Sequence, residues 1–348
     1  MLKTLLTTTA AKANLLDGMR AASASALMLL VGCALNAPEF SWAAIGAFWT
    51  SLATAPATAR SRLASMLSFA LLSTLGGVLV TYTAALSATA GALAILIFVT
   101  LAGLTRIWGD SAYQVAILAA TACVVMIDHP SAASGDMGYL GLYLLGCLFA
   151  AALSMAIWQV RPFAPEYHHN NWRQAAVQSV RDAVAKLHDH ASLSSDGVRF
   201  ALRLGVATTA AYLAVHILQL PCGYWATMAV LLILQPSAAG TLPRSVERAV
   251  GTVVGTLIAV AIGGLAQTPL QIALMVFPLV CLTMALRPVG YSVFIAFLTP
   301  SFVLVADYAM PAFEYNHALA RLENNLLGSA IAIAATLILW PLTDRLKK

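Results

Sequence analysis

Twelve runs of apolar residues, most of them close to the thickness of a bilayer in length, limit most strongly how this chain can fold. Hydrophobic residues make up 60% of the 348 residues and charged residues only 9%, against about 25% charged in average soluble proteins. A water-soluble core could not bury so much apolar surface, so we predict an all-α, polytopic membrane protein. The runs lie near residues 19–36, 41–55, 62–82, 87–105, 111–127, 138–159, 199–218, 223–237, 245–265, 269–286, 291–307 and 318–341.

Two of these runs are short, and the distribution of positive charge decides how we interpret them. The runs at 41–55 and 223–237 would extend only about 22 Å as helices, so they must thin the bilayer, continue into flanking turns or be re-entrant. If all twelve runs cross and the N-terminus is cytoplasmic, 18 of the 19 Lys and Arg residues lie on the cytoplasmic side. Arg321 is then the one basic residue outside. We therefore predict twelve spans with both termini in the cytoplasm.

The two halves of the chain repeat each other. The matches are Arg20, Pro38 and Trp42 with Arg203, Pro221 and Trp225 (183 apart), Arg106 with Arg287 (181 apart), and Gly146 and Trp158 with Gly328 and Trp340 (182 apart). In the third helices Arg62 matches Arg248 or, almost equally well, Arg244. Because each half has six spans, an even number, the first helix of each half begins on the same side of the membrane. This predicts parallel repeats related by a pseudo-twofold axis along the membrane normal. Because the repeat needs the first run, we expect a retained helix there rather than a cleaved signal peptide.

We divide the chain into a first six-helix repeat (1–160), a polar connector (161–198) and a second six-helix repeat (199–348). Apolar residues at helical spacing in the connector predict an amphipathic cytoplasmic helix. Its histidines lack Cys or carboxylate neighbours at ligand spacing, and the five cysteines of the chain lie in or beside apolar runs. We therefore expect no metal site and no cofactor.

Small residues recur at every fourth position in the ninth run, at Gly251, Gly255, Ala259 and Gly263. This spacing places them on one face of a helix, where a neighbouring backbone can approach closely. Glycine weakens a helix, so four small residues on one face indicate a tight helix contact.

The stretch from Pro221 to Gly263 contains Y-W-A, L-Q-P, an arginine, E-R and G-T, followed by glycine, in that order. It resembles the signature of the fusaric acid resistance family, which comprises bacterial inner-membrane exporters of aromatic carboxylic acids. The family is distantly similar to plant aluminium-activated malate transporters. The resemblance implies an inner-membrane exporter of small organic acids. Many members have a larger soluble region where this chain has the 38 residues 161–198.

Arginines are the expected contacts for an organic anion, because a guanidinium meets a carboxylate with two parallel hydrogen bonds and stays charged. The candidates lie near the cytoplasmic ends of helices one, three and four of each half. They are Arg203, Arg248 and Arg287 with their counterparts Arg20, Arg62 and Arg106. The alternative is that these arginines only set the topology.

Arg321 breaks the charge pattern and precedes Asn325 by one helical turn. We predict that both line the pathway, because polar groups inside a span usually face a cavity or a polar partner. The alternative is an interfacial arginine that pairs with Glu314 or Glu323.

Aromatic and acidic residues near the outer side supply further candidates. Trp42, Trp225 and Tyr224 would stack on an aromatic substrate or, alternatively, belong to an interfacial aromatic belt. The candidates for proton coupling are Asp307, Glu314 and Glu323.

The leading hypothesis is an exporter of small aromatic acids that works with or without a proton gradient. The alternatives are a passive organic-anion channel and a non-transporting scaffold. Enzyme motifs such as HExxH are missing from the sequence, so we expect no catalytic residues. The expected partners are the organic anion and the lipid bilayer, without nucleic acid, because the excess of basic residues reports topology. A periplasmic adaptor and a homo-oligomer are left open.

Overall fold

The computed structural model describes residues 14–53, 59–127, 137–159, 195–266, 268–310 and 316–339, and every regular element in these residues is a helix. The first half contains α2 (Leu15–Leu35), α3 (Phe40–Leu52), α4 (Ala59–Leu86), α5 (Ala88–Leu104), the 3-10 helix η1 (Thr105–Trp108), α6 (Asp110–Ile127) and α8 (Gly138–Gln159). The second half contains α10 (Asp196–Leu218), α11 (Tyr224–Ile233), α12 (Ala238–Gly263), α13 (Pro269–Leu286), α14 (Tyr291–Ala309) and α15 (His317–Ile338). The predicted connector helix lies outside the described residues.

The predicted all-α fold class is confirmed. Each predicted apolar run overlaps one α-helix. The largest difference is at α12, which begins at Ala238 instead of near residue 245. Ser237 caps this helix because its Oγ accepts a hydrogen bond from the Gly240 N–H at 3.2 Å. The helix then continues through Pro243. Arg248 therefore lies nearly three turns inside α12, and our expectation that it sits at the helix end is wrong.

Nine helical segments in the described part of the chain are long and apolar enough to cross a membrane. Their outer faces are covered by large apolar side chains. On α4, for example, Leu67, Leu71, Leu75 and Leu79 are exposed at every fourth position, which makes one whole face of the helix apolar. Such surfaces are stable in lipid and not in water. The chain is a multi-pass membrane protein.

Three helices, α3, α11 and α15, are not among these nine. α3 has 13 residues and α11 has 10, so they extend about 20 Å and 15 Å, against about 30 Å for the hydrocarbon core. α15 is long enough but carries polar residues in its first turns, among them Arg321 and Asn325. The twelve-span topology therefore stays a prediction.

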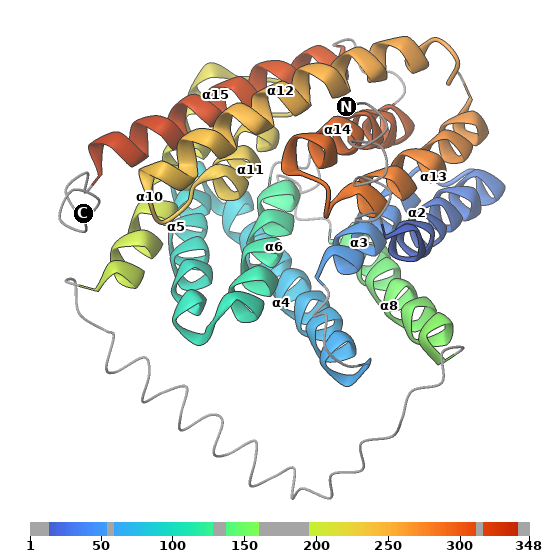
Figure 1. Cartoon of the computed structure of the whole chain (residues 1–348), viewed down its shortest axis with the longest axis horizontal. Helices are drawn as coiled ribbons and strands as arrows, with labels where there is room; N and C mark the ends of the chain where they lie inside the picture. The colour runs from blue at the N-terminus through green and yellow to red at the C-terminus, as the bar shows by residue number, and fades with distance from the viewer. Residues whose placement is uncertain are drawn as a thin grey trace, which may run out of the picture.

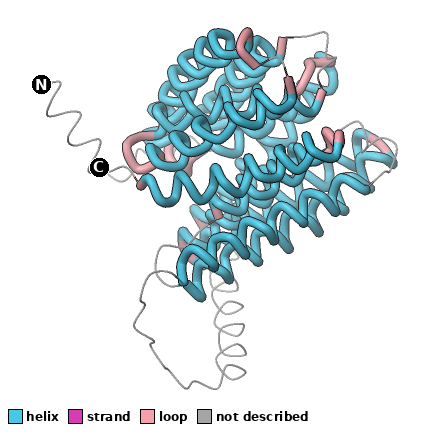
Figure 2. The backbone as a smooth tube through the Cα atoms, turned by 90° about the vertical axis from the view of Figure 1, so that its right-hand side faces the viewer, coloured by secondary structure: helices cyan, strands magenta, loops and turns pink. Residues whose placement is uncertain are grey.

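The two halves pack through crossed contacts that can be followed in Figure 1. α2 lies along α13, and α10 lies along α5, so the first helix of each half packs on the fourth helix of the other. Within each half the third helix packs on the fifth (α4 on α6, α12 on α14) and the second on the sixth (α3 on α8, α11 on α15). Figure 2 shows the helices from the side, running past one another and joined by short loops where the connections are described.

Two glycines mark equivalent close contacts in the two halves. A Cβ on Gly146 of α8 would collide with the Ala43 carbonyl oxygen of α3, and a Cβ on Gly328 of α15 would collide with the Ala226 carbonyl oxygen of α11. Gly328 follows Gly146 by 182 positions, and Ala226 follows Ala43 by 183. Only glycine permits this approach of two helix backbones. The pairing matches the offsets of the predicted repeat, whose symmetry axis stays a prediction.

Candidate functional site

A cavity of about 560 Å³ lies where helices of the two halves meet. Its volume falls within the range of about 300–1,000 Å³ that is typical of small-molecule sites. The walls are formed by the C-terminal ends of α3 and α11, by η1, by the starts of α6, α12 and α14, and by the α13–α14 link. Its polar lining includes Arg106, Asp110, Gln114, Gln235, Arg244 and Arg287.

Three arginines give this cavity its positive charge. The Arg244 guanidinium carbon lies 3.7 Å from the centroid of the Tyr291 ring, and its Nε donates a hydrogen bond to the Leu232 carbonyl at 3.4 Å. Arg287 Nη1 donates to the Leu52 carbonyl at 3.4 Å. These contacts hold the side chains in place and leave other N–H groups of each guanidinium for a ligand.

Acidic groups do not neutralise these arginines. Asp110 is the one acidic residue in the lining, and none of the three arginines is in an ion pair with a described acidic residue. Burial lowers the pKa of Arg287 below its ordinary value, and the nearby Arg244 lowers it further, whereas Asp17 raises it. An arginine nevertheless stays protonated, because its ordinary pKa exceeds about 12. The arrangement suits an anionic ligand.

Aromatic side chains line the same cavity. The Arg106 guanidinium carbon lies 5.4 Å from the Tyr113 ring centroid, and Tyr291 stacks on Phe294 with centroids 6.3 Å apart. Aromatic rings beside cationic groups provide a surface for a planar aromatic acid.

The lining residues come in pairs related by the sequence repeat. Arg106 and Arg287 are 181 positions apart, as are Tyr113 and Phe294. Because both members of each pair line one cavity, the cavity lies across the boundary between the two halves.

A second polar group is buried between α12 and α15. Arg248 Nε donates to Asn325 Oδ1 at 2.8 Å, and Arg248 Nη1 donates to the Tyr291 hydroxyl at 3.0 Å. Asn325 Nδ2 in turn donates to the backbone carbonyl of Arg321 at 2.7 Å. Asn325 therefore contacts the Arg248 side chain and the backbone of Arg321.

Arg321 is completely buried, which rules out the interfacial arginine considered from the sequence. Its guanidinium carbon lies 5.0 Å from the Trp225 ring and 5.3 Å from the Phe302 ring. Glu323, one of its two suggested partners, is exposed, and Glu314 lies outside the described residues. Neither Arg321 nor Arg248 lines the cavity described above.

The other predicted arginines have structural contacts. Arg20 and Arg62 both bind Asp17 Oδ1, at 2.6 Å and 2.9 Å. Arg203 donates to the backbone carbonyls of Gln235 and Pro236. The structure thus brings only Arg106 and Arg287 of the six predicted helix-end arginines into the cavity lining.

Our site prediction missed the cavity arginine Arg244 and the aromatic residues Tyr113, Tyr291 and Phe294. The sequence contained a signal for Arg244, since it was the alternative partner of Arg62 in the repeat. We preferred Arg248 and placed it at the helix end, because we expected α12 to begin later than it does.

The predicted aromatic residues are mostly buried inside the protein. Trp42 and Trp225 are 7% and 0% exposed, which does not fit a belt facing lipid headgroups. Trp42 packs on Tyr139 with centroids 4.7 Å apart, and Trp225 packs on Tyr224 at 5.4 Å. Neither tryptophan lines the 560 Å³ cavity, so stacking of a substrate on them remains a prediction.

Of the three candidates for proton coupling, Asp307 has the most specific contact. Its Oδ1 lies 2.5 Å from Nδ1 of His317, which is buried at the start of α15. His317 also packs edge-on against Trp225, with centroids 6.3 Å apart.

The described residues contain no group of three His, Cys, Asp or Glu side chains that could hold a metal ion. The cysteines Cys123, Cys147 and Cys281 are buried as free thiols.

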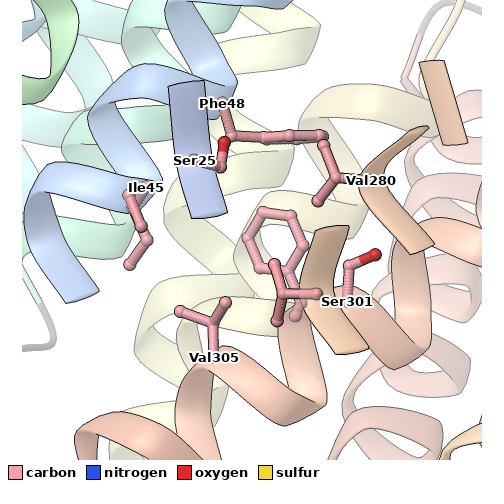
Figure 3. Close-up of a pocket in the computed structure, with 9 residues that line it drawn as sticks. Ser25, Ile45, Phe48, Val280, Ser301 and Val305 are labelled. Carbon is pink, nitrogen blue, oxygen red and sulfur yellow. The ribbon is translucent and has the colours of Figure 1, made fainter. Parts of the chain in front are cut away.

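A smaller, apolar pocket lies between α2, α3, α13 and α14, and Figure 3 shows its lining. Phe48 and Ile45 come from α3, Val280 from α13, and Ser301 and Val305 from α14. Its volume of about 20 Å³ would hold little more than one water molecule. It is too small for an organic acid.

Residues 210–335 match the family model described as fusaric acid resistance protein-like. This part of the chain is similar to fusaric acid resistance protein-like proteins. The match covers α11 to α14, most of α15 and the C-terminal part of α10, so it includes Arg244, Arg248, Arg287 and Arg321. The resemblance noted in the sequence is confirmed.

The chain is also similar to proteins of several bacteria. It is 35% identical over 159 residues to the uncharacterized protein YhfK of Escherichia coli K12, and the aligned residues are 44% of this chain and 22% of YhfK. It is 32% identical over 180 residues to the inner membrane protein YccS of the same organism, covering 50% of this chain and 24% of YccS. The protein slr1298 of Synechocystis is 31% identical over 150 residues, 43% of this chain and 19% of slr1298. The chain therefore spans less than a quarter of these relatives. No solved structure matches it.

Proposed function

We propose that this protein is a transporter that exports small organic anions, in particular aromatic carboxylic acids, across the bacterial inner membrane. The observation that carries the proposal is the 560 Å³ cavity, which is lined by aromatic rings and by three arginines that form no ion pair with a described acidic residue. A guanidinium would bind the carboxylate, and Tyr113, Tyr291 or Phe294 would contact the ring. The inner membrane location of the relative YccS supports the proposed compartment.

The proposed topology places this cavity on the cytoplasmic side. With both termini in the cytoplasm, the C-terminal ends of α3, α5, α11 and α13 and the N-terminal ends of α6, α12 and α14 are cytoplasmic. These are the helix ends that form the cavity walls. An exporter needs its loading site there. The crossed helix contacts of the two halves support the proposed twelve spans in two parallel repeats.

The pair of Asp307 and His317 is our candidate for proton coupling. A carboxylate and an imidazole 2.5 Å apart can exchange one proton. Under the proposed topology this pair lies toward the outer end of α14, where a proton would enter.

Ligand-induced thermal stabilisation of the purified protein tests the binding step. Benzoate should raise the melting temperature, whereas benzamide, which has the same ring without the charge, should not. A ligand at 100 times its Kd stabilises the folded state by about 2.7 kcal/mol. Equal shifts with both compounds, or none with any carboxylate of a panel, would exclude the anion site.

A passive channel is the alternative that transport assays separate from an exporter. In proteoliposomes a channel passes current that reverses at the Nernst potential of the anion. A coupled exporter instead moves benzoate against its gradient when a pH gradient is imposed, and Asp307→Asn should abolish this accumulation.

A further inference from the structure

Two arginines lie side by side inside the protein, away from the cavity. Arg248 of α12 and Arg321 of α15 are both completely buried. Arg248 is linked to Asn325, whose side chain also holds the Arg321 backbone carbonyl. Neither guanidinium is in an ion pair with a described acidic residue. Two positively charged guanidinium groups are thus both buried away from water.

Both guanidinium groups have buried N–H donors without a hydrogen-bond partner. These donors are Nη2 of Arg248 and Nε and Nη1 of Arg321. Trp225 and Phe302, at 5.0 Å and 5.3 Å, partly compensate the Arg321 charge through their rings. An aromatic ring does not accept the hydrogen bonds that the N–H groups donate in the guanidinium plane. The remaining donors require an acceptor with several lone pairs.

The acidic residues Asp307 and Glu323 do not form ion pairs with these two arginines. Asp307 contacts His317 at 2.5 Å, and Glu323 points out from α15 and is exposed. Burial of an uncompensated charge is among the most destabilising arrangements in a protein. An anion that accepts hydrogen bonds from both arginines would remove this cost.

We infer that Arg248 and Arg321 form a second anion-binding site, occupied by the carboxylate of the transported acid after it leaves the cavity. This inference rests on the proposed export function. Tyr291 connects the two sites, because its ring lies against Arg244 of the cavity lining and its hydroxyl accepts a hydrogen bond from Arg248. The anion passes from one set of arginines to the next toward the outer end of α15.

Trp225 provides a built-in reporter for this site. It is fully buried and its ring lies 5.0 Å from the Arg321 guanidinium carbon. Iodide quenches tryptophan by direct contact and carries the single negative charge of a carboxylate. We therefore titrate the purified protein with iodide and take the signal lost in Trp225→Phe as the contribution of Trp225. In the wild type this contribution should be quenched along a saturating curve.

Variants assign the quenching to the arginine pair. Arg321→Gln and Arg248→Gln should each weaken iodide binding about 10- to 100-fold, because each removes a charged donor. Arg60→Gln, on an exposed arginine at the start of α4, should keep the wild-type curve. Size-exclusion chromatography checks folding. If a Gln variant does not fold, Arg321→Lys replaces it and should weaken binding because it lacks the planar fork.

Competition with benzoate then tests whether the site takes a carboxylate. Benzoate should restore the Trp225 signal in the wild type. Quenching that does not saturate, or that persists in Arg321→Gln and Arg248→Gln, would overturn the site. Quenching that benzoate leaves unchanged would show a halide site and overturn its role for the transported acid. These readouts do not depend on transport. If the protein does not export benzoate, saturable quenching by iodide would therefore still support an anion site at Arg248 and Arg321.

Discussion

Two arginines share the single carboxylate of Asp17, near the start of α2. Its Oδ1 lies 2.6 Å from Arg20 Nη2 and 2.9 Å from Arg62 Nη2, while Asn14 donates to its Oδ2 at 2.5 Å. Arg20 and Arg62 are almost completely buried. The contrast with Arg248 and Arg321 is informative, since neither of those buried arginines is in an ion pair with a described acidic residue.

Asp17→Asn should therefore destabilise the protein. The substitution leaves two buried guanidinium groups without a counterion, which costs about 3–5 kcal/mol for a fully buried pair. Because Asp17 itself is 30% exposed, we expect about 2 kcal/mol. A thermal melt in detergent measures the loss, and Glu247→Gln on the exposed surface of α12 is the matched control. Equal melting temperatures for both variants and the wild type would contradict the role of Asp17.

At the scale of the element, α12 and α14 are held together by small residues. A Cβ on Gly255 would lie 2.6 Å from Thr299 Cβ and 2.7 Å from the Ala296 carbonyl oxygen, and Gly251 meets Ser292 in the same way. The stripe ends before Gly263, beside which there is open space. The sequence predicted the contact, but it did not predict how far along the helix the contact extends.

Gly255→Leu should separate α12 from α14. A large side chain at a backbone contact typically costs about 1–3 kcal/mol, more where the backbone must shift. Gly263→Leu lies on the same face of the same helix, so it should express and melt like the wild type. Expression level and melting temperature of the two variants make the comparison. If both behave alike, the packing of the stripe is not what stabilises this helix pair.

The helices of this protein were predictable because apolar runs of bilayer length leave few alternatives. The start of α12 was not, since Ser237 and Gly240 form a cap that lies before the apolar run. The contact of Arg248 with Asn325 joins residues 77 positions apart. Such a contact depends on how α12 and α15 pack, which neither periodicity nor the repeat determines.

At the scale of the whole molecule, details at helix ends follow the repeat. α2 ends at Asn36 with φ of 51°, and α10 ends at Gln219 with φ of 52°, 183 positions later. Both residues adopt the left-handed conformation that commonly ends a helix. The crossed packing also follows the repeat, because α2 and α10 are equivalent first helices that pack on the equivalent fourth helices α13 and α5. Together these observations support two parallel halves.

Cysteine labelling tests the parallel arrangement. Single cysteines are introduced into a cysteine-free background. Glu39→Cys and Gln219→Cys lie just after the first helix of each half, whereas Trp108→Cys and Pro288→Cys lie just after the fourth. A membrane-impermeant maleimide should label the first two from outside in intact spheroplasts, and the last two only after lysis. If the two members of either pair are labelled from opposite sides, the halves are inverted rather than parallel.

The cavity between the halves is the centre of the functional account, because it brings Arg106 and Arg287, one from each half, to one site together with Arg244. The most direct measurement is the initial rate of benzoate efflux from proteoliposomes at a concentration below saturation. Arg106→Gln and Arg287→Gln should each lower this rate about 10- to 100-fold through weaker binding of the carboxylate. Arg60→Gln, outside both sites, should match the wild type. Equal rates for all four proteins, normalised to the amount reconstituted, would contradict the claim that these arginines bind the transported anion.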